Sequence, residues 1–444
     1  MQGEVEYIPS SLIAGFINEQ EVRIIKLSPE SLVIRISKEV EIHKLKVAFY
    51  IFKDNNYIEL ELEEYEVKSI KRERFCIIYE FIVHNKGYGD NVKRIFKDYL
   101  NYINLRVFGC EGEFSYDMVG YPAELDYDYY ENYNRELEEW MLELDEDAWD
   151  GVDLDGIELA IQIDNYDRYY DFLHMDIEDF KNYYFSKNCI SNKVLKHKEL
   201  TRIYIGNEFC HNLFPDVDLL MNILDKCYRQ NIGITICTTY MMEHQVSYYI
   251  DVIDRIYNWC ICNNYGIDIV INDYGMIELL SDKNDYINIA LGNLLNKRKR
   301  DPRYKYKRDI IQNPELISQN TLNNDIYIEF LECNNIYKHE YQVCGYIMDI
   351  AEGHNSLHMP FYQTNTSQLC PLYAKVTYNN RGQQVSVDNC GRLCKKFYFS
   401  YPKHLKMLGR YNSIFAYDET ILSNKEIIQE YIHQGIDRIV LNFL

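Results

Sequence analysis

Three cysteines in the last quarter of the chain have a spacing that suits metal binding. Within CPLYAKVTYNNRGQQVSVDNCGRLC, 19 residues separate Cys370 from Cys390, and three separate Cys390 from Cys394. If the second pair lies on one helical turn, both thiols point to the same side. Three thiolates leave a tetrahedral site or a cluster one ligand short. Cys210, which ends a predicted strand, is the candidate for the fourth ligand.

Four thiolates can bind either a four-iron four-sulfur cluster or a structural zinc ion, and spacing alone does not choose between them. The third alternative is that these cysteines are reduced structural residues without metal. The C-x3-C pair and the flanking Gly382 and Gly391 favour a metal site. The odd total of 13 cysteines, scattered over a long chain, does not indicate a disulfide framework. Cysteines on apolar stretches, such as Cys227, Cys260 and Cys262, are expected to be small buried hydrophobic residues.

Three further polar residues are candidates for catalysis. His358 and Glu340 lie on predicted strands, where we expect them to transfer protons or orient a substrate. Asp273 follows another predicted strand. Each has a structural alternative: a histidine within an apolar strand is often a hydrogen-bonded core residue. Asp273, like Glu208, would in that case cap the helix that follows its strand.

The elements that must position these residues begin after residue 155. There, short apolar runs alternate with helical segments, which indicates βαβ units over a parallel sheet and an α/β fold. Eight runs are found, and they predict a (β/α)8 barrel. The runs are 201–207, 233–240, 267–273, 286–292, 338–343, 356–362, 413–418 and 436–442. Barrels of this type carry their functional residues where strands end and βα loops begin, so the candidates above should meet at that rim.

The first 110 residues predict a small β-rich domain. Apolar and polar residues alternate with period two from residue 20 to 85, and a helical pattern follows at 92–103. The segment RIIKLSPESLVIRIS (23–37) resembles a PilZ-like motif, a strand, an LSxxS turn and a second strand. The paired arginines that bind a cyclic dinucleotide in such domains do not precede it, so we expect a docking or substrate-presenting module.

An acidic connector is expected at 111–190, between the β-rich domain (1–110) and the barrel domain (191–444). Residues 111–158 contain 18 Asp or Glu and one basic side chain, Arg135. Charge runs usually form solvated linkers. The alternative is a docking segment for a basic protein partner.

A basic segment stands out against the net charge of −22, which disfavours general nucleic-acid binding. Eight of the twelve residues from Lys297 to Arg308 are Lys or Arg. Lys297, Arg298, Lys299, Arg300 and Arg303 are candidates for contacts with RNA phosphates, and Tyr304 and Tyr306 for stacking on bases. The alternative is that the segment pairs with the acidic connector. Without a signal sequence or a long apolar run, we expect a cytoplasmic protein with no membrane association.

Four segments resemble the collagenase-like peptidases (peptidase family U32). They are IYIGNEFCHNLF (203–214), GNLLNKRKRDPR (292–303), SLHMPFYQTNTSQLCPLYA (356–374) and CGRLC (390–394), and the resemblance covers roughly residues 190 to 444. It is strongest to members that hold a four-iron four-sulfur cluster and take part in oxygen-independent hydroxylation during ubiquinone biosynthesis; other members hydroxylate RNA bases. The resemblance implies that Cys210, Cys370, Cys390 and Cys394 are the cluster ligands.

The chain departs from this family in two places. The spacer between Cys370 and Cys390 is longer than in the ubiquinone proteins. The signature of the peptidase-named members is replaced by SLHMPFY, which retains His358 but has its cysteine twelve residues later. The resemblance therefore implies an oxygen-independent modification, most plausibly hydroxylation, of an RNA base or a small aromatic compound. The alternatives are a non-catalytic, cluster-bearing binding subunit and, last, a peptidase.

Overall fold

The computed structural model describes residues 12–51, 56–108, 125–126, 129–142, 144–300, 315–379, 383–401 and 406–444. The chain divides into two compact units. One is built on residues 1–124, and the other on 125–302, 315–400 and 406–444. In the described part of the chain, no helix is both long enough and apolar enough to cross a membrane.

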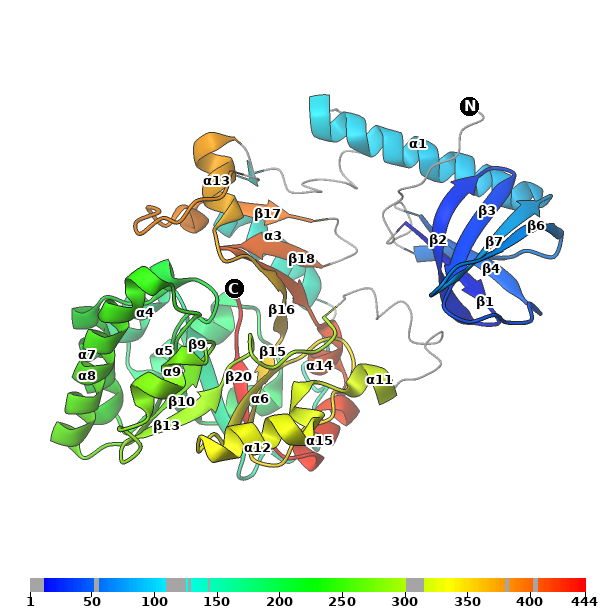
Figure 1. The fold of residues 1–444 in the computed structure, drawn as a ribbon. Helices are drawn as coiled ribbons and strands as arrows, with labels where there is room; N and C mark the ends of the chain where they lie inside the picture. The colour runs from blue at the N-terminus through cyan, green and yellow to red at the C-terminus, as the bar shows by residue number, and fades with distance from the viewer. Residues whose placement is uncertain are drawn as a thin grey trace. The chain divides into compact units, whose positions relative to one another are not determined.

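The amino-terminal unit is a seven-stranded antiparallel sheet with one long helix (Figure 1). In sheet order the strands are β5 (Asn56–Glu61), β4 (Leu45–Ile51), β1 (Ile13–Ile17), β2 (Gln20–Ser28), β3 (Ser31–Ile36), β7 (Ile77–Val83) and β6 (Tyr65–Arg72). Helix α1 (Lys86–Phe108) buries Tyr88, Val92 and Ile95 in the core that the sheet forms. The β-rich domain with its helix is therefore confirmed, while the PilZ-like character remains a prediction.

The second unit contains a closed barrel of eight parallel strands, so the predicted α/β class and parallel barrel are confirmed (Figure 1). Around the barrel the strands are β9 (Glu158–Ile163), β10 (Leu200–Gly206), β11 (Gly233–Cys237), β12 (Ile267–Ile271), β13 (Ile287–Leu291), β14 (Lys338–Gln342), β15 (His354–Met359) and β20 (Ile436–Leu441). β20 pairs with β9 and closes the barrel. Closure by the last predicted strand is thus correct.

The sequence prediction of the barrel strands contains two errors: one run was wrongly included and one strand was missed. The run at 413–418 is not a barrel strand, because residues 413–417 form β19 (Ser413–Tyr417) of a separate antiparallel sheet. Its place is taken by β9, which lies within the range that we assigned to the acidic connector. Both runs are short, apolar and buried, so local sequence cannot tell which neighbour each one pairs with.

Helices connect the barrel strands. They are α4 (Tyr166–His174), α5 (Ile177–Lys187), α6 (Lys193–His197), α7 (Val217–Arg229), α8 (Val246–Asn263), α9 (Gly275–Leu280), α11 (Glu315–Ser318), α12 (Asp325–Cys333), α14 (Glu419–Ser423) and α15 (Lys425–His433), with short 3-10 turns η1 (His211–Leu213), η2 (Glu243–Gln245) and η3 (Thr321–Asn323). Helix α7 shows why such segments form: Asp216 caps it by accepting the Leu219 amide, and Leu220, Ile223 and Leu224 repeat on the face that it buries.

A five-stranded antiparallel sheet is inserted after β15. In sheet order it contains β16 (Phe361–Thr366), β19, β18 (Met407–Arg410), β17 (Tyr398–Ser400) and β8 (Leu125–Asp126), and its neighbours are α3 (Tyr129–Met141), α13 (Pro371–Tyr378) and the 3-10 turn η4 (Leu393–Lys395). The predicted strand at 356–362 spans the end of β15 and the start of β16, which Pro360 separates. This insertion carries three of the four candidate cysteines.

Candidate metal centre

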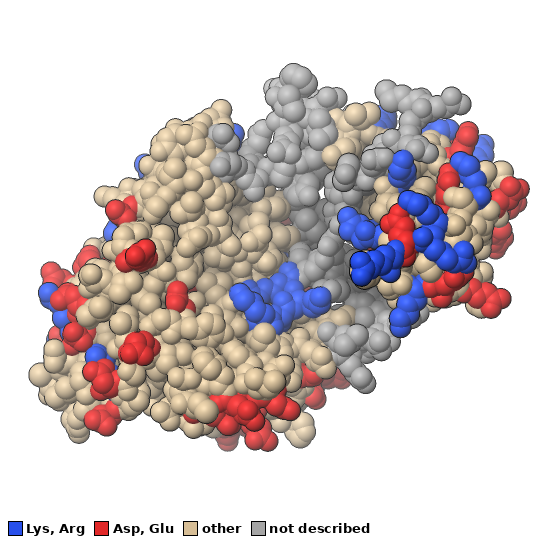
Figure 2. Space-filling model, viewed as in Figure 1, with Lys and Arg blue, Asp and Glu red and all other residues tan. Residues whose placement is uncertain are grey.

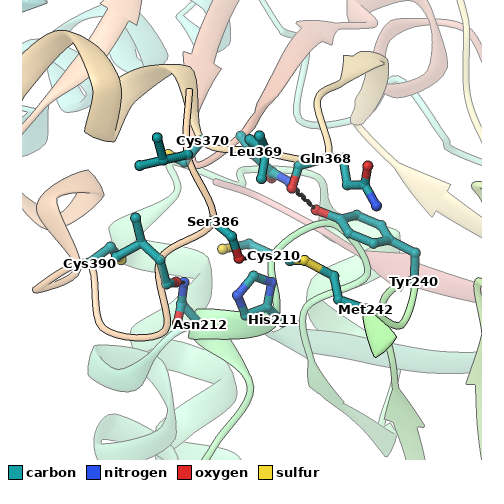
Figure 3. Close-up of a pocket in the computed structure, with 13 residues that line it drawn as sticks. Cys210, His211, Asn212, Tyr240, Met242, Gln368, Leu369, Cys370, Ser386 and Cys390 are labelled. Carbon is teal, nitrogen blue, oxygen red and sulfur yellow. Dashed lines mark hydrogen bonds between the residues drawn. The ribbon is translucent and has the colours of Figure 1, made fainter. Parts of the chain in front are cut away.

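Three of the four candidate cysteines line one pocket, as Figure 3 shows. Cys210, Cys370 and Cys390 are among the residues that line this pocket, which is partly open to solvent. The thiol of the fourth cysteine, Cys394, is close enough to Cys210 to act on it electrostatically, as are the thiols of Cys370 and Cys390. Residues from three separate segments of the chain therefore meet as neighbours.

Cys210 is positioned by the end of β10. Gly206 has a φ of +109°, and a Cβ there would lie 2.4 Å from the carbonyl oxygen of Cys237, so only glycine fits. The Asn207 side chain then accepts hydrogen bonds from the backbone amides of Phe209 and Cys210, both at 2.9 Å. This turn directs the chain out of the barrel and towards the inserted sheet.

Cys370 is the N-cap residue of α13. Its sulfur accepts a hydrogen bond from the Tyr373 amide at 3.4 Å, and the thiol lies 3.3 Å from the Tyr411 carbonyl oxygen. Pro371 suits the first helical position because an amide there would have no intrahelical acceptor. The helix amino terminus favours negative charge on the Cys370 sulfur.

Cys390 and Cys394 do not share a helical turn, so that expectation is wrong. Gly391 and Arg392 both have left-handed backbone conformations, with φ of +63° and +53°, before the short 3-10 turn η4 that contains Cys394. The Arg392 guanidinium lies 3.1 Å from the centre of the Tyr166 ring on α4. Lys395 pairs with Asp167 of the same helix at 2.5 Å. These contacts fix the segment against the barrel.

Asn412 joins the segments that carry Cys210 and Cys370. Its amide nitrogen donates to the carbonyl oxygens of Phe209 at 2.6 Å and Ser367 at 2.7 Å. Tyr240 adds a second connection, because its hydroxyl donates to the Gln368 carbonyl oxygen at 2.7 Å, the dashed line in Figure 3. The loop before Cys390 is held in turn by Asn212, which donates to the Val387 carbonyl oxygen at 2.9 Å.

Burial favours the protonated form of three of the four thiols. It raises the pKa of Cys210 well above the ordinary value, that of Cys370 to about 11 and that of Cys394 to about 12. The neighbouring thiols raise the pKa of Cys210 further, whereas the positive charge of Arg410 opposes the increase at Cys394. Four sulfurs in this environment need a cation to become thiolates together.

Four cysteine sulfurs are the donor set that an iron–sulfur cluster or a structural zinc ion takes, and all four are buried or half-buried here. Within the part of the chain that the structure describes, no three His, Cys, Asp or Glu side chains form a ready-made site for a single metal ion. The four cysteines are therefore neighbours, but their thiols are not arranged around a single metal position.

The predicted catalytic pair lies elsewhere. His358 Nε2 is 2.7 Å from Glu340 Oε2, both side chains are buried in the barrel, and neither lines the cysteine pocket. Glu340 also accepts a bond from the Tyr204 hydroxyl at 3.1 Å, and Arg438 donates to that hydroxyl at 3.0 Å. The two residues are thus brought together, but in the polar interior network of the barrel and apart from the cysteines.

Asp273 and Glu208 both hold neighbouring loops. The Asp273 carboxylate accepts the backbone amides of Met241 at 3.1 Å and Gly275 at 2.8 Å, which fastens the loops after β11 and β12. Glu208 is completely buried and accepts bonds from Asn272 at 3.0 Å and Asn293 at 2.8 and 2.9 Å. The structural alternative expected each residue to cap the helix after its strand. Asp273 does accept the first amide of α9, that of Gly275, whereas Glu208 does not cap a helix and binds Asn272 and Asn293 instead.

Only the first part of the basic segment is described. Lys297 and Lys299 are exposed, whereas Arg298 and Arg300 are partly buried, and Arg303, Tyr304 and Tyr306 lie outside the described residues. Figure 2 shows a compact group of Lys and Arg side chains on the viewed face of the barrel unit. Among the described residues, none of the four basic side chains from 297 to 300 forms an ion pair with a carboxylate.

Sequence reasoning missed Arg410 and Asn412. Arg410 is 3% exposed and acts on Cys394, while Asn412 links the cysteine-bearing segments. The only local signal was the polar stretch R-Y-N at 410–412 between two apolar strands, which an ordinary hairpin turn explains equally well.

Comparison with known proteins does not assign this chain to a family. No family model and no curated protein matches it. Among solved structures, the crystal structure of an uncharacterized Legionella protein aligns with 16% identity and a TM-score of 0.18, over 23% of this chain and 98% of its own. A similarity this weak carries no argument about fold or function.

Proposed function

We propose that the chain is an iron–sulfur protein of the collagenase-like peptidase type. Cys210, Cys370, Cys390 and Cys394 would bind a four-iron four-sulfur cluster, and the protein would catalyse an oxygen-independent modification of an RNA base or a small aromatic compound. The single observation that supports this best is the proximity of four cysteines that are far apart in sequence. Isolated structural cysteines have no reason to collect around one pocket.

The two candidate groups require different spacings of the four sulfurs. A zinc ion with Zn–S bonds of about 2.3 Å draws its four sulfurs to within about 4 Å of one another. A four-iron cluster binds each sulfur at a different corner, so its ligands are spaced more widely. We favour the cluster over zinc because of the family resemblance.

The cluster would supply electron transfer or substrate activation. The chain itself would tune this chemistry through Arg410, a buried positive charge beside Cys394. Converting a C–H bond to C–OH with water releases two electrons and two protons. An external electron acceptor or an organic hydroxyl donor must therefore take part.

Anaerobic purification tests the proposal. The protein should be brown, contain about four iron and four sulfide per chain, and lose both when any one of the four cysteines is replaced by serine. Cys227→Ser and Cys260→Ser are the controls, because these residues are buried on α7 and α8 away from the pocket. A colourless protein that contains one zinc ion would show that zinc, and not a cluster, is the bound group. Equal loss of colour in the four ligand variants and the two control variants would overturn the ligand assignment.

The second candidate is a non-catalytic subunit whose cluster is structural or transfers electrons. The composition of the pocket favours it, because its described lining contains no Asp, Glu, Lys or Arg that could bind a charged substrate, and His211 is the one imidazole in that lining. Anaerobic incubation with RNA and mass spectrometry of the nucleosides separates the two functions. A cluster-loaded wild type without turnover, but with a stable protein partner, would support the subunit.

A further inference from the structure

Several buried polar atoms near the carboxyl ends of β14 and β15 lack a partner. Among the described residues, Nε and Nη1 of Arg298, Oε1 of Gln363 and Nδ1 of His358 are buried without any hydrogen bond. Gln363 is 4% exposed and His358 is completely buried, so bulk solvent does not reach them. Unpaired polar atoms are rare in protein interiors because each one costs about 1–3 kcal/mol.

Two of these residues, Gln363 and Arg298, contact one side chain, that of Gln342 at the end of β14. Gln342 Oε1 accepts a hydrogen bond from the backbone amide of Gln363 at 3.0 Å and lies 3.5 Å from Arg298 Nη2. Gln342 also pairs in register with His358 on β15. Because Glu340 contacts His358 inside the barrel, Gln342, two residues further on, points to the same interior.

Four residues of the basic segment after β13 are described. Lys297 and Lys299 are exposed, while Arg298 and Arg300 are partly buried. Among the described residues, Arg300 donates to the backbone carbonyl oxygens of Asn293 and Asn296. Burial and the adjacent charge of Arg298 lower the pKa of Arg300 to about 9, although the Glu208 carboxylate opposes this shift. Neither guanidinium group forms an ion pair with a described carboxylate.

An uncompensated buried cation is costly, and the natural compensation is an anion. The unpaired acceptor atoms of the protein indicate which donor groups the ligand carries. A neutral His358 whose Nε2 donates to the Glu340 carboxylate has Nδ1 as an acceptor, and Gln363 Oε1 is an acceptor as well. A ligand that satisfies all of them combines an acidic group with hydroxyl groups.

We propose that the carboxyl-terminal end of the barrel binds a small hydroxylated anion, whose carboxylate or phosphate is held by Arg298 with the charge of Arg300 nearby, and whose hydroxyl groups donate to Gln363 and His358. The ends of parallel barrel strands are where such folds bind ligands. The site is separate from the cysteine pocket, since none of these four residues lines it. It does not depend on the cluster.

Thermal unfolding of the full chain with added ligands tests this inference. Malate and glycerol 3-phosphate are the hydroxylated carboxylate and phosphate probes, and succinate, inorganic phosphate and sodium chloride at equal ionic strength are the controls. At least one hydroxylated probe should raise the melting temperature in a saturable manner, and more than its control does. The probe that succeeds identifies the acidic group. No response beyond that to sodium chloride would overturn the proposal.

Substitutions locate the site. Arg298→Met should weaken binding of the active probe at least tenfold and, without probe, should not lower the melting temperature, because it removes an uncompensated charge. Lys299→Met, which removes the same charge from the exposed neighbouring position, should change affinity less than twofold. If Arg298→Met does not fold, Gln363→Met provides the same test. Equal binding by wild type and either of these two variants would refute the site, and cluster colour recorded in the same samples keeps this result separate from the proposed function.

Discussion

Nε2 of His358 on β15 lies 2.7 Å from Oε2 of Glu340 on β14, and both side chains are completely enclosed by the barrel. Tyr204 on β10 donates to the same carboxylate, and its hydroxyl receives a bond from Arg438 on β20. One buried carboxylate is therefore connected to three other strands. This network stabilises the barrel interior whether or not the pair also acts on a substrate.

Replacing Glu340 by Leu should lower the free energy of unfolding by about 3 kcal/mol, because Tyr204 and His358 lose a buried partner. The double variant Glu340→Leu/His358→Leu should lose less than the sum of the single variants, since neither polar group is then left behind. Urea unfolding of the four proteins measures this coupling. Additive losses would show that the two side chains do not interact.

Removing the positive charge of Arg410 should lower the reduction potential of the proposed cluster by some tens of millivolts. Reduction adds negative charge, and Arg410 stabilises negative charge at Cys394. Potentiometric titration of Arg410→Gln under argon measures the shift, and Arg410→Lys should restore most of it. An unchanged potential at full cluster content would contradict the electrostatic role.

Asn412→Leu should destabilise the protein by about 2–4 kcal/mol and accelerate the loss of cluster colour in air. The substitution leaves the carbonyl oxygens of Phe209 and Ser367 without their donor. Asn334→Ala is the matched control, because Asn334 donates one bond to Phe330 at the exposed end of α12. It should change stability by less than about 0.5 kcal/mol. Equal effects would contradict the linking role of Asn412.

Cys227 should make stability decrease as the pH rises above about 9. Burial raises the pKa of its thiol to about 12, so the folded protein keeps a proton that the unfolded chain releases near its ordinary pKa of 9.0. Between these values stability should fall by about 1.4 kcal/mol per pH unit from this group alone, and it should be unaffected below them. Comparing chemical unfolding of wild type and Cys227→Ala from pH 7 to 11 isolates the effect. Parallel curves would show that the thiol titrates normally.

If the segment from Lys297 to Arg308 binds RNA, affinity should fall steeply with salt. Lys297→Gln and Lys299→Gln should each reduce the slope of log affinity against log salt by roughly 0.7–0.9. Filter binding at several salt concentrations measures it. An affinity that does not change with salt would favour pairing of the segment within the chain. Arg303 and the two lysines would then no longer be candidates for contacts with RNA phosphates.

The residue pattern alone was sufficient for several features. Apolar runs of five or six residues, separated by helical segments, predicted an α/β fold with a parallel barrel, and period-two alternation predicted the amino-terminal sheet, because buried faces impose these periods on any sequence. The four cysteines were also chosen from sequence, through their spacing and the family resemblance. The structure places them near one another, and their role as metal ligands stays a prediction.

Other features depend on contacts between distant residues. The exchange of β9 for β19 in the barrel could not be predicted, since strand pairing is decided by which neighbours a strand meets and not by its own composition. The direction of each side chain in the basic segment, the enclosure of His358 and Glu340, and the link that Asn412 provides likewise appear only in the tertiary structure. Sequence determines which groups are available for burial and for chemistry. Only packing determines which of these groups are left without a partner. The cysteines of the pocket could therefore be chosen from the sequence, whereas the proposed anion site could be found only in the tertiary structure.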